Sequence, residues 1–482
     1  MTRSNTFLAR VANAAAALTG RPTGPVSVRR FDAAGNGRAW GNPHFGRVAT
    51  ETLAATATVR SRARHAYANN AHARAAVDAW AAALVGTGAR PTPSHPSADI
   101  RAEIGAAVDE WANEADIGGR SDWWSLQADI VRELVIAGEA LVLMIDTPDG
   151  LRLRQIPVEL LDDSETRDLA NGGSIVGGVE FDAQGRRVAY WIRPEQAASA
   201  YASWAPAKRM DAADVLHIFK QIGAGQVRGI SWLAPVLLKL NEIDQLSDAL
   251  LVGFKVSAMF CAVLTNENDL SGDHPFDGQQ DHSIVTGGLE PGTIKVAPGG
   301  YKLNFASPMQ AQQAPDFLSA EIRTVAVGMG VPSHLVSGDL SKANYGSLRA
   351  DLVSFRQRIE QVQYGVLAPQ LLRPVHSRAV TSLIFSGAIS GTDFEAAPRD
   401  WTGAEFIMPA QPWIDPAKDA QALETLMGAG LMSRRQAVAE RGWSVEAVDA
   451  EIAADREREA ALGLNFAAAP KPISKEADSA DA

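Results

Sequence analysis

Few residues in this sequence have types and spacings that could do chemistry. The glycine-rich segment 223–229 is the first candidate, because such segments can cradle a phosphate. It lacks the Lys and Ser/Thr with which a phosphate-binding loop holds phosphates and Mg²⁺. Its third glycine also comes one residue too late for a dinucleotide-binding turn. The segment therefore predicts no nucleotide site.

Metal-ligand patterns are similarly incomplete. His65 and His72 share a helical face, but they lie among arginines and lack the spacing of a zinc site. Acids recur every fourth residue between 269 and 281, yet Pro275 and Gly278 interrupt them. A calcium loop needs ligands at alternate positions and a late Glu. We predict a solvated acidic loop and no metal site.

Nucleophile patterns are missing as well. The serine in segment 387–391 does not stand at the centre of a nucleophile elbow. Cys261 lies in an apolar run and is predicted to be a small buried residue. The sequence thus predicts no catalytic residue and no cofactor.

Length and composition indicate a globular protein of several parts. A chain of 482 residues exceeds one ordinary hydrophobic core, and its single cysteine excludes an internal disulfide framework. No run of about 18 apolar residues is uninterrupted. Arg10 cuts short the only stretch that resembles a signal peptide. We expect a soluble protein that is not exported.

The charge is unevenly distributed. The first hundred residues hold twelve arginines, no lysine and four acids, a balance of +8. Since the whole chain carries −11, the remainder carries −19. The basic part could contact nucleic acid or an acidic neighbour. The acidic remainder argues against tight wrapping of a duplex, since phosphate contacts need Lys and Arg.

Hydrophobic periodicity indicates a helix-plus-sheet protein. A helix is expected at 62–86, followed by two helices between 100 and 144, with Ser121 as the N-cap of the second. Short alternating runs then predict strands, separated by turn residues. These are 140–145, 151–156, 177–181, 187–192 and 215–219.

A protruding hairpin follows the sheet region. A helix to about Phe260 and another over 315–330 bracket a polar insert, which is expected to contain short strands. The two helices must therefore return towards each other. Segment 331–346 follows and could be a plain surface connector, and a long helix is expected over 347–372.

The C-terminal part is expected to hold a strand pair near 378–395, then a Pro-rich crossing. Two or three helices are expected over 416–462. The composition after Ala467 is typical of a tail without fixed structure.

Several stretches, taken in order, resemble the lambda-like family of tailed-bacteriophage portal proteins. Each stretch alone is weak evidence for the resemblance, but the ordered set is specific and covers roughly residues 60–455. They are 68–74 with 84–88, 111–118 with Gly138-Glu139-Ala140, 178–190, His217-Ile218-Phe219, 225–231, Gly330-Val331-Pro332, 344–347 and 413–419.

The resemblance implies an α+β portal fold with a mixed helix and sheet wing, a two-helix stem, a small β-rich clip and a helical crown. The implied boundaries are a basic arm (1–60), wing (61–235), stem helix (236–261), clip (262–314), second stem helix (315–330), tunnel loop (331–346), long helix and remaining wing (347–412), crown (413–466) and tail (467–482).

The resemblance also implies a function. About twelve copies would form a ring at one capsid vertex of the virion, a channel for double-stranded DNA in packaging and ejection. Its implied partners are the terminase large subunit, head-completion or adaptor proteins, and the major capsid and scaffold proteins, with assembly in the bacterial cytoplasm and no membrane. Implied DNA-facing residues are Ser337, Asp339, Ser341, Lys342, Asn344 and Arg349; implied clip contacts to terminase are Asp269, Asp273, Asp277, Asp281 and Glu290.

Two alternatives stay open. A different structural ring or adaptor protein of a virion would equally lack catalytic patterns. An uncharacterised hydrolase is the other alternative, although the missing metal and nucleophile patterns disfavour it.

Overall fold

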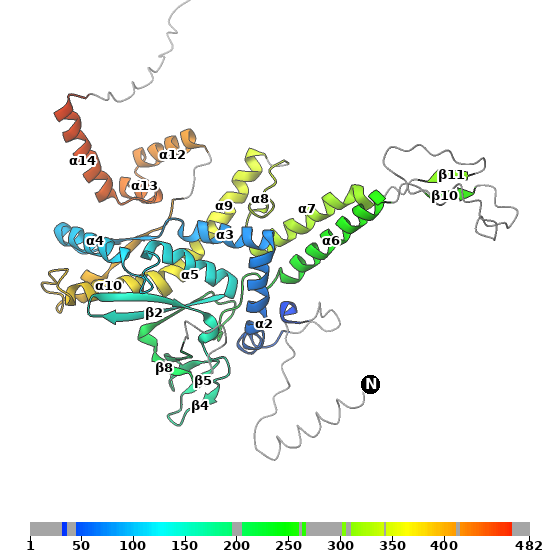
Figure 1. The fold of residues 1–482 in the computed structure, drawn as a ribbon. Coiled ribbons are helices and arrows are strands. Elements are labelled where there is room, and N and C mark those ends of the chain that lie inside the picture. Colours follow the sequence, from blue (N-terminus) through cyan, green and yellow to red (C-terminus); the bar gives the residue numbers. More distant parts are fainter. Residues whose placement is uncertain are drawn as a thin grey trace, which may run out of the picture. The chain divides into compact units, whose positions relative to one another are not determined.

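The computed structural model describes residues 31–35, 45–194, 205–259, 263–266, 301–304, 310–341, 344–410 and 415–464 (Figure 1). The chain forms two compact units, each made of separate segments. Unit 1 comprises residues 1–82, 129–143 and 155–362, and unit 2 comprises 83–128, 144–154 and 363–482. Helices and strands occur in both, which confirms the predicted α+β class. Among the described residues, no helix is both long and apolar enough to cross a membrane.

Two consecutive helices open unit 1. Helix α2 (Val48–Asn69) and helix α3 (Ala71–Val85) replace the single predicted helix 62–86. Residues 48–60, predicted as part of an arm, are helical. The break falls at Asn70, whose extended backbone ends α2 and whose side-chain oxygen accepts from the N–H of Ala73, 2.9 Å away. Asn70 is thus the N-cap of α3.

Two antiparallel sheets follow. One has the strand order β3-β2-β9, made of β2 (Glu139–Thr147), β3 (Gly150–Ile156) and β9 (Val215–Phe219). The other has the order β4-β5-β6-β7-β8. Its strands are β4 (Arg167–Asp168), β5 (Ser174–Val176), β6 (Val179–Phe181), β7 (Arg187–Ile192) and β8 (Lys208–Asp211). Side chains from both sheets and their loops share a core that includes Leu141, Ile156, Leu161, Val179, Tyr190, Ile192, Val215 and Val227.

The predicted hairpin of helices is present. Helix α6 (Leu237–Met259) and helix α7 (Gln310–Met329) lie side by side and run in opposite directions (Figure 1). At their base, Lys239 Nζ lies 2.5 Å from Glu321 Oε2. Strands β10 (Val263–Asn266) and β11 (Tyr301–Asn304) pair antiparallel beyond the helices. Helix α7 begins five residues before Pro315, which lies inside the helix and lacks the N–H of a helical hydrogen bond.

Two further helices complete unit 1. The chain turns at Gly330, which has a φ of +72°, and forms the short helix α8 (Ser333–Ser337). Helix α9 (Tyr345–Val362) follows. The predicted long helix 347–372 therefore spans α9 and the π-helical segment η4 (Gln363–Leu372). This segment contains Pro369 and begins the last of the three segments of unit 2.

Unit 2 is mainly helical. Helix α4 (Ala98–Asn113) lies in unit 2, and helix α5 (Trp123–Ala137) runs from unit 2 into unit 1. They match the predicted pair, but Asp122 caps α5 by accepting from the N–H of Ser125, so the assignment of Ser121 is wrong by one residue. Strand β1 (Arg90–Pro93) pairs antiparallel with β12 (Ala404–Ile407). Helix α11 (Pro398–Thr402) and the three C-terminal helices α12 (Pro416–Gly428), α13 (Arg434–Glu440) and α14 (Val445–Leu462) complete this unit.

The strand pair predicted near 378–395 is wrong. Helix α10 (Arg373–Phe385) occupies this region and buries Val375, Ala379 and Val380. These positions recur at helical spacing, so burial of one helix face outweighs the strand preference of the β-branched residues.

Candidate functional site

A buried ion cluster ties the main segments of unit 1 together. Glu139, at the start of β2, has a fully buried side chain. Its carboxylate accepts from Arg228 Nη2 at 2.7 Å, from His217 Nε2 at 2.8 Å and from the backbone N–H of Gly229 at 2.8 Å. We call Glu139, His217, Arg228, Arg60 and Asp163 the Glu139 cluster.

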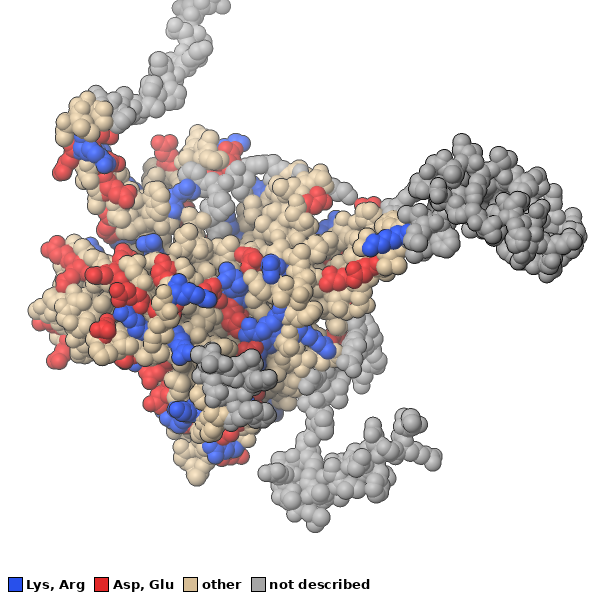
Figure 2. Space-filling model, viewed as in Figure 1, with Lys and Arg blue, Asp and Glu red and all other residues tan. Residues whose placement is uncertain are grey.

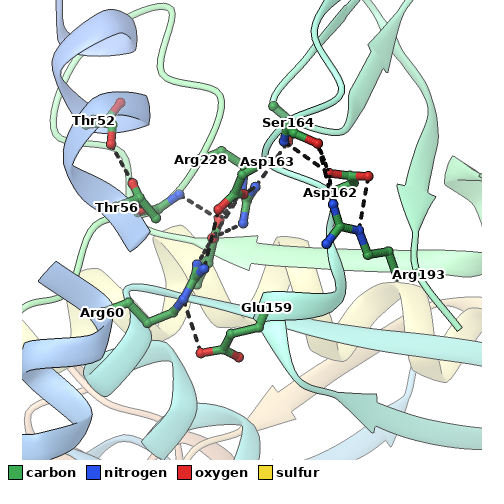
Figure 3. Close-up of polar contacts among 12 residues, drawn as sticks. Thr52, Thr56, Arg60, Glu159, Asp162, Asp163, Ser164, Arg193 and Arg228 are labelled. Atoms are coloured by element: carbon green, nitrogen blue, oxygen red, sulfur yellow. Dashed lines mark hydrogen bonds and ion pairs between the residues drawn. The ribbon is translucent and has the colours of Figure 1, made fainter. Parts of the chain in front are cut away.

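Arg60 and Asp163 extend the cluster to two further elements. Arg60, on α2, has Nη1 3.5 Å from Glu139 Oε1 and Nε 3.2 Å from Glu159 Oε1. Asp163 pairs with Arg228 Nη1, which also donates to the carbonyl of Gly177 at 3.0 Å. Figure 3 shows the side chains of Arg60, Arg228 and Asp163 converging from α2, the loop before Gly229 and the loop after β3.

The electrostatics of the cluster keep Glu139 ionised. Burial alone would raise the pKa of Glu139, but Arg228 and His217 hold it well below its usual range. Burial lowers the pKa of His217, so its ring is neutral. The hydrogen-bond network then assigns the proton to Nε2, which donates to Glu139 and leaves Nδ1 facing Arg187 at 3.5 Å.

The arrangement is suited to holding elements together. Both carboxylate oxygens of Glu139 already accept bonds from protein donors, and a group saturated in this way has no free lone pair aimed at a substrate. Within the described ranges, no group of three or more His, Cys, Asp and Glu could hold a metal ion. We therefore infer that the Glu139 cluster stabilises the packing of the unit 1 segments against one another.

Two glycines allow the backbone before β2 to lie close to the backbone of residues 229–231. Gly138 has a φ of +87°, and a Cβ there would lie 2.0 Å from the carbonyl carbon of Ile230. A Cβ on Gly229 would lie 2.2 Å from the carbonyl oxygen of Gly138. The sequence analysis used 138–140, 217–219 and 225–231 only as separate family markers. Their convergence was missed, although a Glu directly before an apolar strand is a signal of a paired buried charge.

The base of the helix pair is attached to the same unit by two polar contacts. Asn70 Nδ2 donates to both carboxylate oxygens of Asp244 on α6, at 2.8 and 2.9 Å. Trp80 Nε1, on α3, donates to the carbonyl of Met329 at the end of α7, 2.9 Å away. Each helix of the pair is thus fixed at its base by a side chain from the α2–α3 region.

Of the predicted DNA-facing residues, Ser337, Asp339, Ser341 and Asn344 lie in an exposed stretch from the end of α8 to the start of α9. The N–H of Asp339 donates to Ser337 Oγ, and Asp339 Oδ1 accepts from the N–H of Ser341. Asn344 and Ser347 exchange hydrogen bonds as the N-cap and third residue of α9. These polar side chains shape the segment itself.

The other predicted residues divide into two groups. Arg349 is exposed on α9. Lys342 lies outside the described residues, as do the predicted clip acids Asp269, Asp273, Asp277, Asp281 and Glu290.

Residues 35–363 match the family described as phage portal protein, lambda family, and the chain therefore belongs to that family. The portal family is structural, and the resemblance predicted from the sequence is confirmed.

Curated relatives agree with this assignment. The chain is 23% identical over 335 residues to a probable portal protein of Halomonas phage phiHAP-1, covering 68% of this chain and 62% of the relative. It is 24% identical over 273 residues to the portal protein of Escherichia phage N15, covering 52% of each. It is 23% identical over 318 residues to portal protein B of Escherichia phage lambda, covering 60% and 59%. The matches span 52–62% of the relatives' lengths.

Two solved structures are similar to this chain over most of its length. The neck of a native gene transfer agent particle, computed with C12 symmetry, has a TM-score of 0.45 at 15% identity, over 84% of this chain and 93% of that chain. An HK97-family phage portal protein from Corynebacterium diphtheriae has a TM-score of 0.30 at 13% identity, over 66% and 88%.

Proposed function

We propose that this chain is the subunit of a ring-shaped channel at one capsid vertex, through which double-stranded DNA enters during packaging and leaves at ejection. Membership of the lambda portal family over residues 35–363 carries the proposal, since this range includes α6, α7, α8 and α9. The ring holds about twelve copies, as closed symmetry of identical subunits permits. The chain acts without catalysis and resides in the virion.

In this proposal, α6 and α7 are the stem, and 262–314 is the clip at its outer end. The clip docks the terminase large subunit and later the head-completion proteins. Its acids Asp269, Asp273, Asp277, Asp281 and Glu290 would pair with basic groups of those partners. Helices α12 to α14 form the crown.

The tunnel loop 331–346 and the start of α9 face the DNA in this proposal. A channel must let DNA slide, and each Lys or Arg contact to a phosphate retards sliding. The net charge of −11 is therefore expected of a guide that repels DNA, with Lys342 and Arg349 as isolated points of attraction. Acidic and basic side chains both occur on the face seen in Figure 2.

Electron microscopy of the purified full chain tests the proposal. We expect ring-shaped particles with a central hole, and a mass by native mass spectrometry that is an integral multiple of 51.2 kDa, near twelve copies. A chain that stays monomeric at all concentrations and salt conditions, or that forms particles without a hole, would contradict a channel.

A further inference from the structure

The three C-terminal helices of unit 2 bury very little of their own surface. Of the residues in α12, α13 and α14, all of which the structure describes, only Ala437 is buried. Helices of such lengths are marginal in water by themselves and gain most of their stability from packing an apolar face. The described part of the subunit covers little of that apolar surface, so a further surface is expected to cover it.

The end of α14 presents two leucines in a fixed position. Leu462 and Leu464 are 66% and 48% exposed. Between them, Gly463 has a φ of +66°, and the N–H of Leu464 donates to the carbonyl of Glu459 at 2.9 Å. This bond and the bond from the N–H of Gly463 to the carbonyl of Ala460 form a Schellman cap. The two exposed leucines therefore stand on an ordered helix end.

The start of the same helix lines a cleft of about 680 Å³. One wall is a face of the β1–β12 sheet, where Thr92 lies opposite Glu405 and Ile407 follows two residues further along β12. The other wall includes Ala439 of α13 and Trp443, which directly precedes the N-cap of α14 and is 62% exposed. The cleft thus offers apolar side chains from both walls.

The charges of the helix end and of the cleft are complementary. Arg458 and Glu459 lie one turn before Leu462, on its side of α14. Arg458 is paired on its own helix with the exposed acid three residues before it, a type of pair that contributes little. In the cleft, Glu405 has no cation within 4.0 Å among the described residues, and Arg435 pairs with one exposed carboxylate 3.4 Å away. A helix end with both signs of charge therefore meets a cleft with both signs.

Helix α14 cannot place its own end in the cleft at its start. It has 18 residues and is about 27 Å long, since an α-helix rises about 1.5 Å per residue. Figure 1 shows α13 beside the start of α14 and away from its end. A leucine pair that fills the cleft must come from another molecule.

We propose that Leu462 and Leu464 of one copy of this chain insert beside Trp443 in the cleft of the next copy. This inference rests on the proposed ring. The contact joins two different surfaces, which is the kind of contact that closes identical subunits into a ring. Each copy gives one helix end and receives one, so its C-terminal helices gain the packing surface that the single subunit does not provide.

Paired cysteines test the contact directly. In a chain with Cys261→Ala, the changes Leu464→Cys and Ala439→Cys place one thiol on each surface. Added diamide takes up two electrons and two protons as two thiols form one disulfide. We expect assembled rings to give a ladder of covalent multimers on denaturing gels, whereas either cysteine alone can join at most two copies. Leu464→Cys with Leu431→Cys, whose second thiol is exposed outside the cleft, should give no ladder.

Subunit association gives an independent readout. In Leu462→Ser with Leu464→Ser, the concentration at which half of the chain is in rings should rise at least about tenfold, because two apolar side chains no longer leave water. Trp443→Ala should weaken association too, and its effect should not add to that of Leu464→Ser, since the two side chains contact each other. All three residues are exposed in the subunit, so its melting temperature should be nearly unchanged. Leu431→Ser is the control and should leave association as it is.

The outcomes separate this inference from the proposed channel. Wild-type chain that forms no ring contradicts the channel itself. Rings that form normally, give no ladder with the paired cysteines and associate equally well in the leucine variants overturn only the contact between C-terminal helices. Unchanged rings whose incorporation into capsids falls in the leucine variants would assign the leucines to another virion protein instead.

Discussion

Glu139 depends on several protein donors at once, which makes its replacement costly. In Glu139→Gln the side chain keeps its size, but Arg228 loses its buried counter-charge. Breaking one partner of a buried pair typically costs about 3–5 kcal/mol. We expect a loss of that order in the free energy of unfolding, measured by urea denaturation.

The exposed Glu360 on α9 offers a control. Glu360→Gln should change the free energy of unfolding by less than about 0.5 kcal/mol. If both variants unfold at the same urea concentration, the Glu139 cluster does not lock unit 1.

His376 predicts a pH dependence within unit 2. Among the described residues, neither ring nitrogen of this buried residue has a hydrogen-bond partner, and burial lowers its pKa from 6.5 to about 4. The unfolded chain therefore takes up a proton at higher pH than the folded chain does. Stability from the neutral ring is present above about pH 6.5 and is lost as the pH falls to about 4, by roughly 3 kcal/mol.

Thermal melts between pH 7 and pH 4 measure this effect. His376→Leu removes the titrating group, so its melting temperature should fall less steeply with acid than that of the wild type. His65→Leu, at an exposed position, is the matched control. Parallel pH profiles for wild type and His376→Leu would show that His376 does not contribute.

Residue-level prediction from the sequence had a clear limit. Glu139, His217 and Arg228 are visible in the sequence, but their contact spans up to 89 positions, and no local pattern encodes such a pairing. Catalytic motifs, in contrast, are short and local, so the sequence can be searched for them directly.

At the scale of helices and strands, the fold depends on a close backbone contact between the start of β2 and the loop before Trp232. Gly138→Ala places a Cβ against the backbone of Ile230 and keeps a positive φ. Steric overlap and the strained backbone together should cost about 3 kcal/mol or more. We expect a marked fall in melting temperature or in soluble yield.

Gly105, within helix α4, is the matched control. A Cβ there meets no atom within 4 Å, so Gly105→Ala should stabilise the chain by about 0.5–1 kcal/mol through helix propensity. Equal melting temperatures for the two alanine variants would mean that the backbone at Gly138 has room for a Cβ beside Ile230.

Elements with strong local patterns were predicted well. Strands β7 and β9 match the expected ranges 187–192 and 215–219, because alternation and flanking turns agree there. Strand β4 is two residues long and polar, so it has no pattern of its own. Helix α10 was taken for strands, since only its packing reveals that one face is buried.

At the scale of the whole molecule, a protein with a net charge of −11 has to let DNA pass. Lys342→Ala and Arg349→Ala should each reduce DNA packaging or retention while rings still assemble, because each removes one point of phosphate contact. Packaged DNA per particle, measured by nuclease protection, is the readout. Arg323→Ala, an exposed arginine on α7, is the control. Normal packaging by the Lys342 and Arg349 variants would contradict a DNA contact at these residues.

The sequence predicted the helix pair because its two helices are long, periodic segments. It could not predict the two discontinuous units, since their boundaries at 82, 128, 143 and 154 interrupt helices and strands. Such a division follows from long-range packing.

An electron cryomicroscopy reconstruction of the assembled full chain tests the central claim most directly. The account predicts a ring with an open axial hole, the segment from α8 to the start of α9 at its narrowest part, and the α6–α7 pair leading to the clip. A closed particle, or a ring with Ser337–Arg349 on its outer surface, would contradict it.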